Sequence, residues 1–269
     1  MAVLSQSQID SFVERGFCML EGAFGPVQAA AAQDCVWQRM KEKRGIDRDD
    51  PTTWPPAYDI EEHLEAPAVL DCFTDRLARA IEELVGPGRW AGRRRWGLWP
   101  VNFHHGAGVP YRIPDAGWHI DGNWFRHTLD CPKQGLLVVG LFSDVPTRGG
   151  GTIVAAGSHR RTARVLAGNP AGLAHRELFD RVLAEPIGDF CELTGAAGDV
   201  ALCHPFLFHT RGFKHRGAPR ILSNTEASLL APLQLERDGQ ADYSVLEQSI
   251  RAALREPLPA YAQAMQCRF

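Results

Sequence analysis

The stretch Gly198-Asp199-Val200-Ala201-Leu202-Cys203-His204-Pro205-Phe206-Leu207-Phe208-His209-Thr210-Arg211-Gly212 contains two short apolar runs separated by a His-Pro pair. Each run has the length of a buried strand, and Arg220 begins a third run soon after. Strands are predicted at 96–103, 118–120, 136–144, 152–156, 190–194, 199–203, 206–210 and 220–230. About eight strands separated by Gly, Pro and Asp turns are typical of an antiparallel sandwich or jelly roll.

Helical patterns lie on both sides of this β region. Helices are predicted at 5–15, 27–43, 71–85 and 244–254, with a short strand at 17–20 and a Pro-rich loop at 45–58. The pattern predicts a mainly β protein with helical decoration, folded as a single domain over 1–269. Within it we expect a helical N-terminal part (1–89), a β core (90–232), and a C-terminal helix and tail (233–269).

The composition excludes several classes of function. The chain has 269 residues, of which 29 are Lys or Arg and 32 are Asp or Glu, so nothing in its net charge of −3 attracts nucleic acid. The longest apolar stretch, Gly135 to Phe142, is too short to span a bilayer. No signal peptide is evident, and the 7 Cys show no CxxC pair. We therefore expect a cytoplasmic protein with reduced thiols that acts on a small molecule, without nucleic-acid or membrane partners; no oligomeric state follows from the sequence.

The segment Trp118-His119-Ile120-Asp121 places an imidazole and a carboxylate two residues apart. In a strand, alternate side chains share a face, so His119 and Asp121 are predicted to point to one site while Ile120 packs behind them. An HxD pair alone is common, and an ion pair in a turn is its simplest interpretation.

A second histidine strengthens the interpretation of this pair. A jelly roll places its second and seventh strands side by side, which brings His209 close to His119 and Asp121. Two His and one carboxylate on one face of a metal leave three positions open, as in the facial triad of non-haem Fe(II) oxygenases. Arg220, eleven residues after His209, is predicted to face the same cavity and to bind a carboxylate through two parallel hydrogen bonds.

These motifs together resemble the phytanoyl-CoA dioxygenase-like (PhyH) branch of the Fe(II)/2-oxoglutarate-dependent dioxygenases. The resemblance covers about residues 90–230 and rests on four elements: the HxD pair, Gly149-Gly150-Gly151-Thr152, Gly157-Ser158-His159, and the run from Asp199 through His204-Pro205 and His209 to Arg220. It implies a double-stranded β-helix (cupin-like) core in which His119, Asp121 and His209 hold Fe(II). It also implies that 2-oxoglutarate chelates the iron while Arg220 binds its far carboxylate.

The chain departs from the family pattern at two positions after the distal histidine. Arg211 stands where the family often has a small hydroxyl residue or glycine, and Lys214 stands where it has an asparagine. The resemblance therefore does not extend to the secondary contacts with 2-oxoglutarate. Asn102 is a candidate donor to 2-oxoglutarate, and a buried structural amide is an equal alternative.

Other histidines offer alternative ligands. His204 competes with His209, but it precedes Pro205 at a strand end and lies 16 residues from Arg220, whereas the family spacing is that of His209. The adjacent His104 and His105 point to opposite faces of a strand, so at most one of them lines the pocket. His159 is expected to fix the turn around 149–157.

The resemblance implies an oxygenase that uses Fe(II), 2-oxoglutarate and O2 and releases succinate and CO2. Hydroxylation of an unactivated C–H bond in a small molecule, such as a secondary metabolite, an amino acid or a related acid, is the predicted reaction. Desaturation, epoxidation or cyclisation are alternatives within the same chemistry. A cupin-like metal-dependent hydrolase and a binding protein without catalysis are the rival classes.

Overall fold

The core of the protein consists of two antiparallel sheets that face each other. The computed structural model describes residues 2–237 and 242–257. The larger sheet contains, in spatial order, β1 (Phe17–Leu20), β7 (Val200–Cys203), β4 (Leu136–Leu141), β9 (Arg220–Ala227), β3 (Trp99–Asn102) and β2 (Ala57–Ile60). The smaller sheet contains β6 (Asp189–Glu192), β5 (Thr152–Ala156) and β8 (His209–Arg211). This arrangement confirms the predicted jelly roll.

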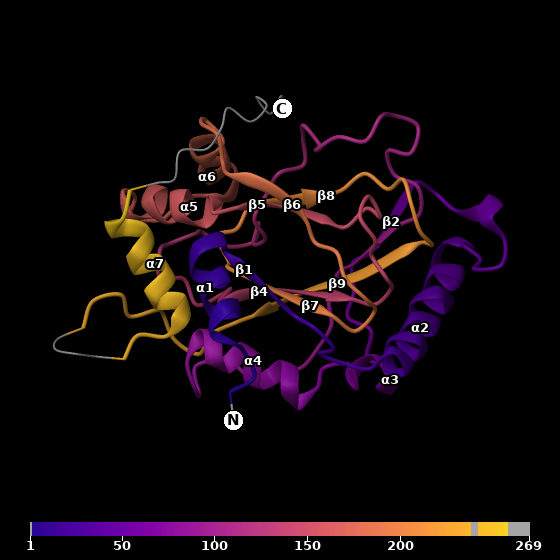
Figure 1. Ribbon diagram of the computed structural model, residues 1–269, viewed down its shortest axis with the longest axis horizontal. Coiled ribbons are helices and arrows are strands. Elements are labelled where there is room, and N and C mark those ends of the chain that lie inside the picture. Colours follow the sequence, from indigo (N-terminus) through magenta and orange to yellow (C-terminus); the bar gives the residue numbers. More distant parts are fainter. Residues whose placement is uncertain (1, 238–241, 258–269) are drawn as a thin grey trace.

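Helices surround the two sheets (Figure 1). They are α1 (Gln6–Arg15), α2 (Pro26–Arg44), α3 (Pro67–Leu70), α4 (Asp75–Val85), α5 (Ser158–Ala167), α6 (His175–Val182) and α7 (Val245–Arg255), with a 3₁₀ turn η1 (Pro51–Thr53). Figure 1 shows α2 at one side of the molecule and α1, α5 and α7 gathered at the other. No helix in these described parts of the chain combines the length and the apolar composition that crossing a membrane requires.

Strand β4 shows why the core sequence is so continuously apolar. Leu137, Val139 and Leu141 point between the two sheets and join an inner cluster with Val154 of the smaller sheet. Val138 belongs instead to the outer cluster, which packs against the helices. Because β4 is buried on both faces, its sequence does not alternate between apolar and polar residues.

Several regions differ from the sequence prediction. The predicted strand 206–210 is found as β8, which begins only at His209, because a turn closed by the hydrogen bond from the N–H of Leu207 to the carbonyl of His204 (3.0 Å) precedes it. The expected strand 118–120 is reduced to one antiparallel bridge, because Gly117 (φ +80°) and Gly122 (φ +104°) turn the chain on both sides of it. The Pro-rich stretch predicted as a loop contains η1 and β2, and β2 exists because β3 supplies its hydrogen-bonding partner. The predicted helix 71–85 is found as α4, which begins four residues later at Asp75, and the short helix α3 before it was not predicted.

Two further helices were not predicted, and one prediction falls partly outside the described residues. Helices α5 and α6 occupy the long connection between β5 and β6, where the sequence indicated neither helix nor strand. The C-terminal helix was predicted at 244–254 and is found as α7. The predicted tail lies mostly in residues 258–269, outside the described residues.

Two buried histidines fasten α1 to the barrel. The Nε2–H of His159 donates to the carbonyl of Val13 (3.1 Å), so this residue holds α1 and not the 149–157 turn expected from the sequence. His204 lies beside it with ring centroids 4.8 Å apart, and its Nδ1 accepts from the backbone N–H of Phe206 (3.1 Å). Gly16 ends α1 with φ +85°, and a Cβ there would come within 2.5 Å of His159 Nδ1.

This histidine pair makes the stability of the fold depend on pH. Burial lowers the pKa of His159 to about 3 and the pKa of His204 well below its usual value. The unfolded chain binds a proton at about pH 6.5, while the folded chain does not. The contribution of His159 to stability is therefore fully present above that pH and is lost as the pH falls from 6.5 towards 3, by up to about 1.4 kcal/mol per pH unit. His204 acts in the same direction.

We expect His159→Asn to remove one such site. Urea unfolding followed by tryptophan fluorescence between pH 7.5 and 5 should give a shallower loss of stability in the variant than in the parent. Parallel curves for the two proteins would show that His159 does not stay neutral in the folded state.

Candidate metal and cosubstrate site

The backbones of His119 and His209 are paired directly. The N–H of His119 donates to the carbonyl of His209 (3.0 Å), and the N–H of His209 donates to the carbonyl of His119 (2.9 Å). This reciprocal pair adds the HxD segment to the free edge of β8 in the smaller sheet. The HxD segment therefore lies beside the strand that carries His209, as expected for a jelly roll, although the two segments pair at one residue only.

His119, Asp121 and His209 converge at one point. The Oδ1 of Asp121 lies 3.6 Å from Nε2 of His119 and 3.8 Å from Nε2 of His209. One donor atom from each residue lies within 4.8 Å of the other two. These separations exceed hydrogen-bond distances but suit three ligands of one ion. Among the residues that the structure describes, this is the one group of three or more His, Cys, Asp or Glu side chains with such geometry.

Both histidines present a lone pair to this point. The Nδ1 of His119 lies 2.7 Å from the carbonyl of Gly117, and the Nδ1 of His209 lies 3.1 Å from the carbonyl of Leu207. A carbonyl only accepts, so each Nδ1 carries the proton and each Nε2 is left free as a metal ligand. Burial, with His119 nearby, lowers the pKa of His209 to about 4 and keeps it in this neutral form.

A further histidine fixes the backbone between the two HxD side chains. The Nε2–H of His175, the first residue of α6, donates to the carbonyl of Ile120 (2.9 Å). Ile120 itself is fully buried, as expected from the strand alternation. Sequence analysis missed His175, because neither α6 nor a recognisable motif marked it.

Arg220 is a buried cation without a partner. It is 1% exposed, and it begins β9 on the face that also carries the inner-cluster residue Leu222. In the described residues, its Nε has no hydrogen-bond partner and no carboxylate forms an ion pair with its guanidinium. Burial lowers the pKa of Arg220 to about 9, and the charge of Arg211 acts in the same direction. A buried charge costs several kcal/mol unless it is paired, so an anionic ligand fits this position.

Asn102 lies beside Arg220 in the sheet, and its amide is engaged by the backbone. Its Nδ2 donates to the carbonyl of Gly212 (3.1 Å), and its Oδ1 accepts from the N–H of His105 (3.1 Å). These contacts fit the alternative in which Asn102 is a buried structural amide and not a donor to 2-oxoglutarate. Gly150 (φ +79°) passes so close that a Cβ would lie 2.6 Å from Asn102 Nδ2, which explains one glycine of the 149–151 run.

The remaining sequence candidates lie outside the three-residue group. His204 joins His159 under α1, as described above. Nε2 of His104 lies 3.3 Å from the carbonyl of Trp54, and His105 packs against Phe213. The Nζ of Lys214 donates to two carbonyls in the turn before β9, those of Arg216 (2.5 Å) and Gly217 (2.8 Å).

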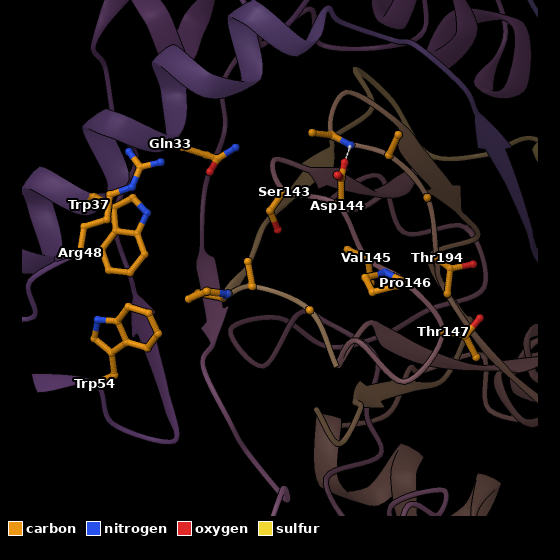
Figure 2. Close-up of a pocket in the computed structure, with 16 residues that line it drawn as sticks. Gln33, Trp37, Arg48, Trp54, Ser143, Asp144, Val145, Pro146, Thr147 and Thr194 are labelled. Carbon is orange, nitrogen blue, oxygen red and sulfur yellow. Dashed lines mark hydrogen bonds between the residues drawn. The ribbon is translucent and has the colours of Figure 1, made fainter. Parts of the chain in front are cut away.

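A separate cleft of about 990 Å³ lies between α2 and the barrel rim (Figure 2). Trp37, Trp54 and Arg48 form one wall, and residues 143–147, 194–197 and 217–219 form the other. Arg48 is already paired with Asp34 (2.7 Å). None of the residues lining the cleft belongs to the metal group, so the cleft is not part of that site.

Comparison with solved structures establishes the fold. EctD from S. alaskensis, solved with 2-oxoglutarate and 5-hydroxyectoine, is 18% identical, and the match covers 84% of this chain and 77% of EctD with a TM-score of 0.53. AviO1 from Streptomyces viridochromogenes Tue57 is 17% identical, with 86% and 98% covered and a TM-score of 0.53. SnoK, a non-heme alpha ketoglutarate dependent carbocyclase from nogalamycin biosynthesis, is 16% identical, with 86% and 88% covered and a TM-score of 0.53.

No family model matches the chain, and no curated protein matches it. The protein thus has the jelly-roll fold of these enzymes. Its membership of the phytanoyl-CoA dioxygenase-like family stays a prediction.

The geometry predicts that Asp121→Ala weakens metal binding without unfolding the protein. The Asp121 side chain is 25% exposed and makes no hydrogen bond within the described residues that the fold would lose. Equilibrium dialysis with Fe(II) or Mn(II) should show a large loss of binding, while thermal unfolding of the metal-free protein stays close to that of the parent. The control variant His204→Gln should bind one metal ion per chain, and loss of binding there instead would reassign the distal ligand.

Proposed function

We propose that this protein is a non-haem Fe(II)- and 2-oxoglutarate-dependent oxygenase that hydroxylates an unactivated C–H bond of a small molecule. One observation carries the proposal: a two-histidine, one-carboxylate group and an unpaired buried arginine share the interior of one jelly roll. The first feature suits an iron with open coordination positions, and the second suits the far carboxylate of a 2-oxo diacid.

In this proposal each residue has a distinct role. His119, Asp121 and His209 hold the metal on one face, with both imidazoles fixed by their Nδ1–H bonds to carbonyls. Arg220 binds the far carboxylate of 2-oxoglutarate. Asn102 acts indirectly: its side chain bonds to the carbonyl of Gly212, the residue after β8, and its backbone pairs with Arg220.

When bound, Fe(II) and 2-oxoglutarate together activate O2, giving succinate and CO2 and placing the second oxygen atom in the substrate. The protein's contribution is to orient the substrate and to exclude water. Trp124, three residues after Asp121, is 66% exposed, so its ring is free to contact a substrate beside the metal group.

The structural neighbours support the class of chemistry and a small-molecule substrate, such as a secondary metabolite, an amino acid or a related acid. The EctD structure contains 5-hydroxyectoine, whereas SnoK is a carbocyclase and SnoN, with a TM-score of 0.52, is an epimerase from the same biosynthesis. Desaturation, epoxidation or cyclisation therefore remain alternatives to hydroxylation on this fold. A metal-dependent hydrolase is disfavoured, because it has no use for the unpaired Arg220.

We also propose that the protein acts in the cytoplasm. All six cysteines in the described parts of the chain are free thiols. Reduced cysteines are typical of a reducing compartment.

Anaerobic visible absorption tests the proposal directly. Metal-free protein titrated with Fe(II) and then with 2-oxoglutarate should develop a metal-to-ligand charge-transfer band only when both are present. Arg220→Gln should need at least tenfold more 2-oxoglutarate to reach half of the band, since it lacks the charge that holds the far carboxylate. Arg220→Lys, which keeps the charge, should show an intermediate requirement.

Circular dichroism of each variant controls for folding. Absence of the band in a parent protein that has bound iron would refute the proposed function. An unchanged requirement in Arg220→Gln would leave the metal assignment in place and remove Arg220 from the cosubstrate site.

A further inference from the structure

Arg211 lies on the inner face of β8, two residues after His209. The register of β8 with β5 pairs His209 with Val154 and Arg211 with Thr152. Val154 belongs to the inner cluster, so His209 and Arg211 both face the space between the sheets. Two residues along a strand cover about 6.6 Å, a distance comparable to the length of a five-carbon dicarboxylate.

The partner of Arg211 is on the opposite sheet. Its Nη2 bonds to Oδ1 of Asp59, which belongs to β2 at the edge of the larger sheet. Asp59 pairs with Pro100, two residues from Asn102, and therefore shares the inner face with Asn102 and Arg220. The ion pair thus crosses from one sheet to the other.

Arg211 and Arg220 are close neighbours. Asn102 pairs with Arg220 across β3 and β9, and its side chain bonds to the carbonyl of Gly212, the residue after Arg211. The mutual proximity of the two guanidinium groups contributes to the lowered pKa of Arg220.

Three cations share this region, because the charge of Lys214 also lies near that of Arg220. The Nζ of Lys214 is held by backbone carbonyls, and of the two arginines Arg211 alone has an ion-pair partner among the described residues. Besides Asp59, the carboxylate whose charge acts on Arg220 is Glu192. Its oxygens already accept from the backbone N–H groups of Arg148, Gly150 and Gly151 and from the hydroxyl of Tyr111. Asp59 is paired with Arg211, and Glu192 forms no ion pair with Arg220, so the guanidinium of Arg220 has no carboxylate partner among the described residues.

We propose that Arg211 is a second residue that binds the far carboxylate of 2-oxoglutarate, exchanging Asp59 for the cosubstrate. The inference rests on the proposed function. The exchange costs little free energy, because a partly exposed ion pair contributes little to stability. The side chains of Arg211 and Asp59 are 27% and 41% exposed. Asp59 then acts as a competitor that holds Arg211 in place before the cosubstrate binds.

The test compares cosubstrate affinity in matched variants by anaerobic titration of the charge-transfer band at saturating Fe(II). Arg211→Gln should weaken 2-oxoglutarate binding about tenfold or more, whereas Asp59→Asn should leave it unchanged or strengthen it. Arg112→Gln is the charge-matched control, because Arg112 pairs with Asp115 and packs on nearby Phe213, and it should shift the affinity less than twofold.

A second ligand separates direct contact from a structural effect. 2-Oxopentanoate chelates a metal as 2-oxoglutarate does but lacks the far carboxylate. Its affinity should be the same in the parent and in Arg211→Gln, so the preference for 2-oxoglutarate shrinks in the variant.

The results distinguish direct binding of the cosubstrate by Arg211 from a structural role of its ion pair. Equal weakening by Arg211→Gln and Asp59→Asn, or equal loss for both ligands, would show that Arg211 acts only through its ion pair and would overturn the inference. A parent-like Arg211→Gln would also overturn it, while leaving the proposed function intact. Absence of the band in the parent protein would refute the proposed function itself.

Discussion

The reciprocal backbone pair between His119 and His209 is the contact on which the site depends. Without these two hydrogen bonds the HxD segment would be a loop with glycines on both sides, free to place Asp121 in many positions. Pairing at one residue is enough to fix the position of Asp121, because the hydrogen bond from His175 to the carbonyl of Ile120 holds the same segment from the other side. Helix α6 thereby stabilises the geometry of the metal group from outside the barrel.

Charge is the second constraint on the interior. The inner cluster is apolar along most of β4, β5 and β7, yet Arg220 and Arg211 extend from the first residue of β9 and the last residue of β8 at one end of it. Unpaired buried charge opposes folding. In the proposed function this stability is recovered when 2-oxoglutarate binds there, which would link cosubstrate binding to the stability of the barrel.

Much of this site was predictable from the sequence, because the local motifs carry their own geometry. The alternation of His119 and Asp121 and the position of Arg220 at the start of a strand depend on strand periodicity and on which strands lie side by side in a jelly roll. The predicted strand 206–210 was only partly right, because β8 begins at His209. The apolar run at 136–144 likewise predicts the strand found as β4.

What the sequence could not supply depends on contacts between distant segments. Strand β2 forms in a Pro-rich stretch because β3 pairs with it, and the partner of Arg211 lies 152 residues away. His159 was assigned to a nearby turn, but it bonds to Val13 at a sequence separation of 146 residues. No local pattern contains such partners, and α6 with His175 was missed for the same reason.

The most direct test of the central claim is a crystal structure of the anaerobic complex with Fe(II) and 2-oxoglutarate, with the iron located by its anomalous scattering. The account predicts one iron bonded to Nε2 of His119, Nε2 of His209 and a carboxylate oxygen of Asp121, with the far carboxylate of 2-oxoglutarate on Arg220. An iron bound elsewhere, or a 2-oxoglutarate whose far carboxylate lies away from Arg220, would contradict it.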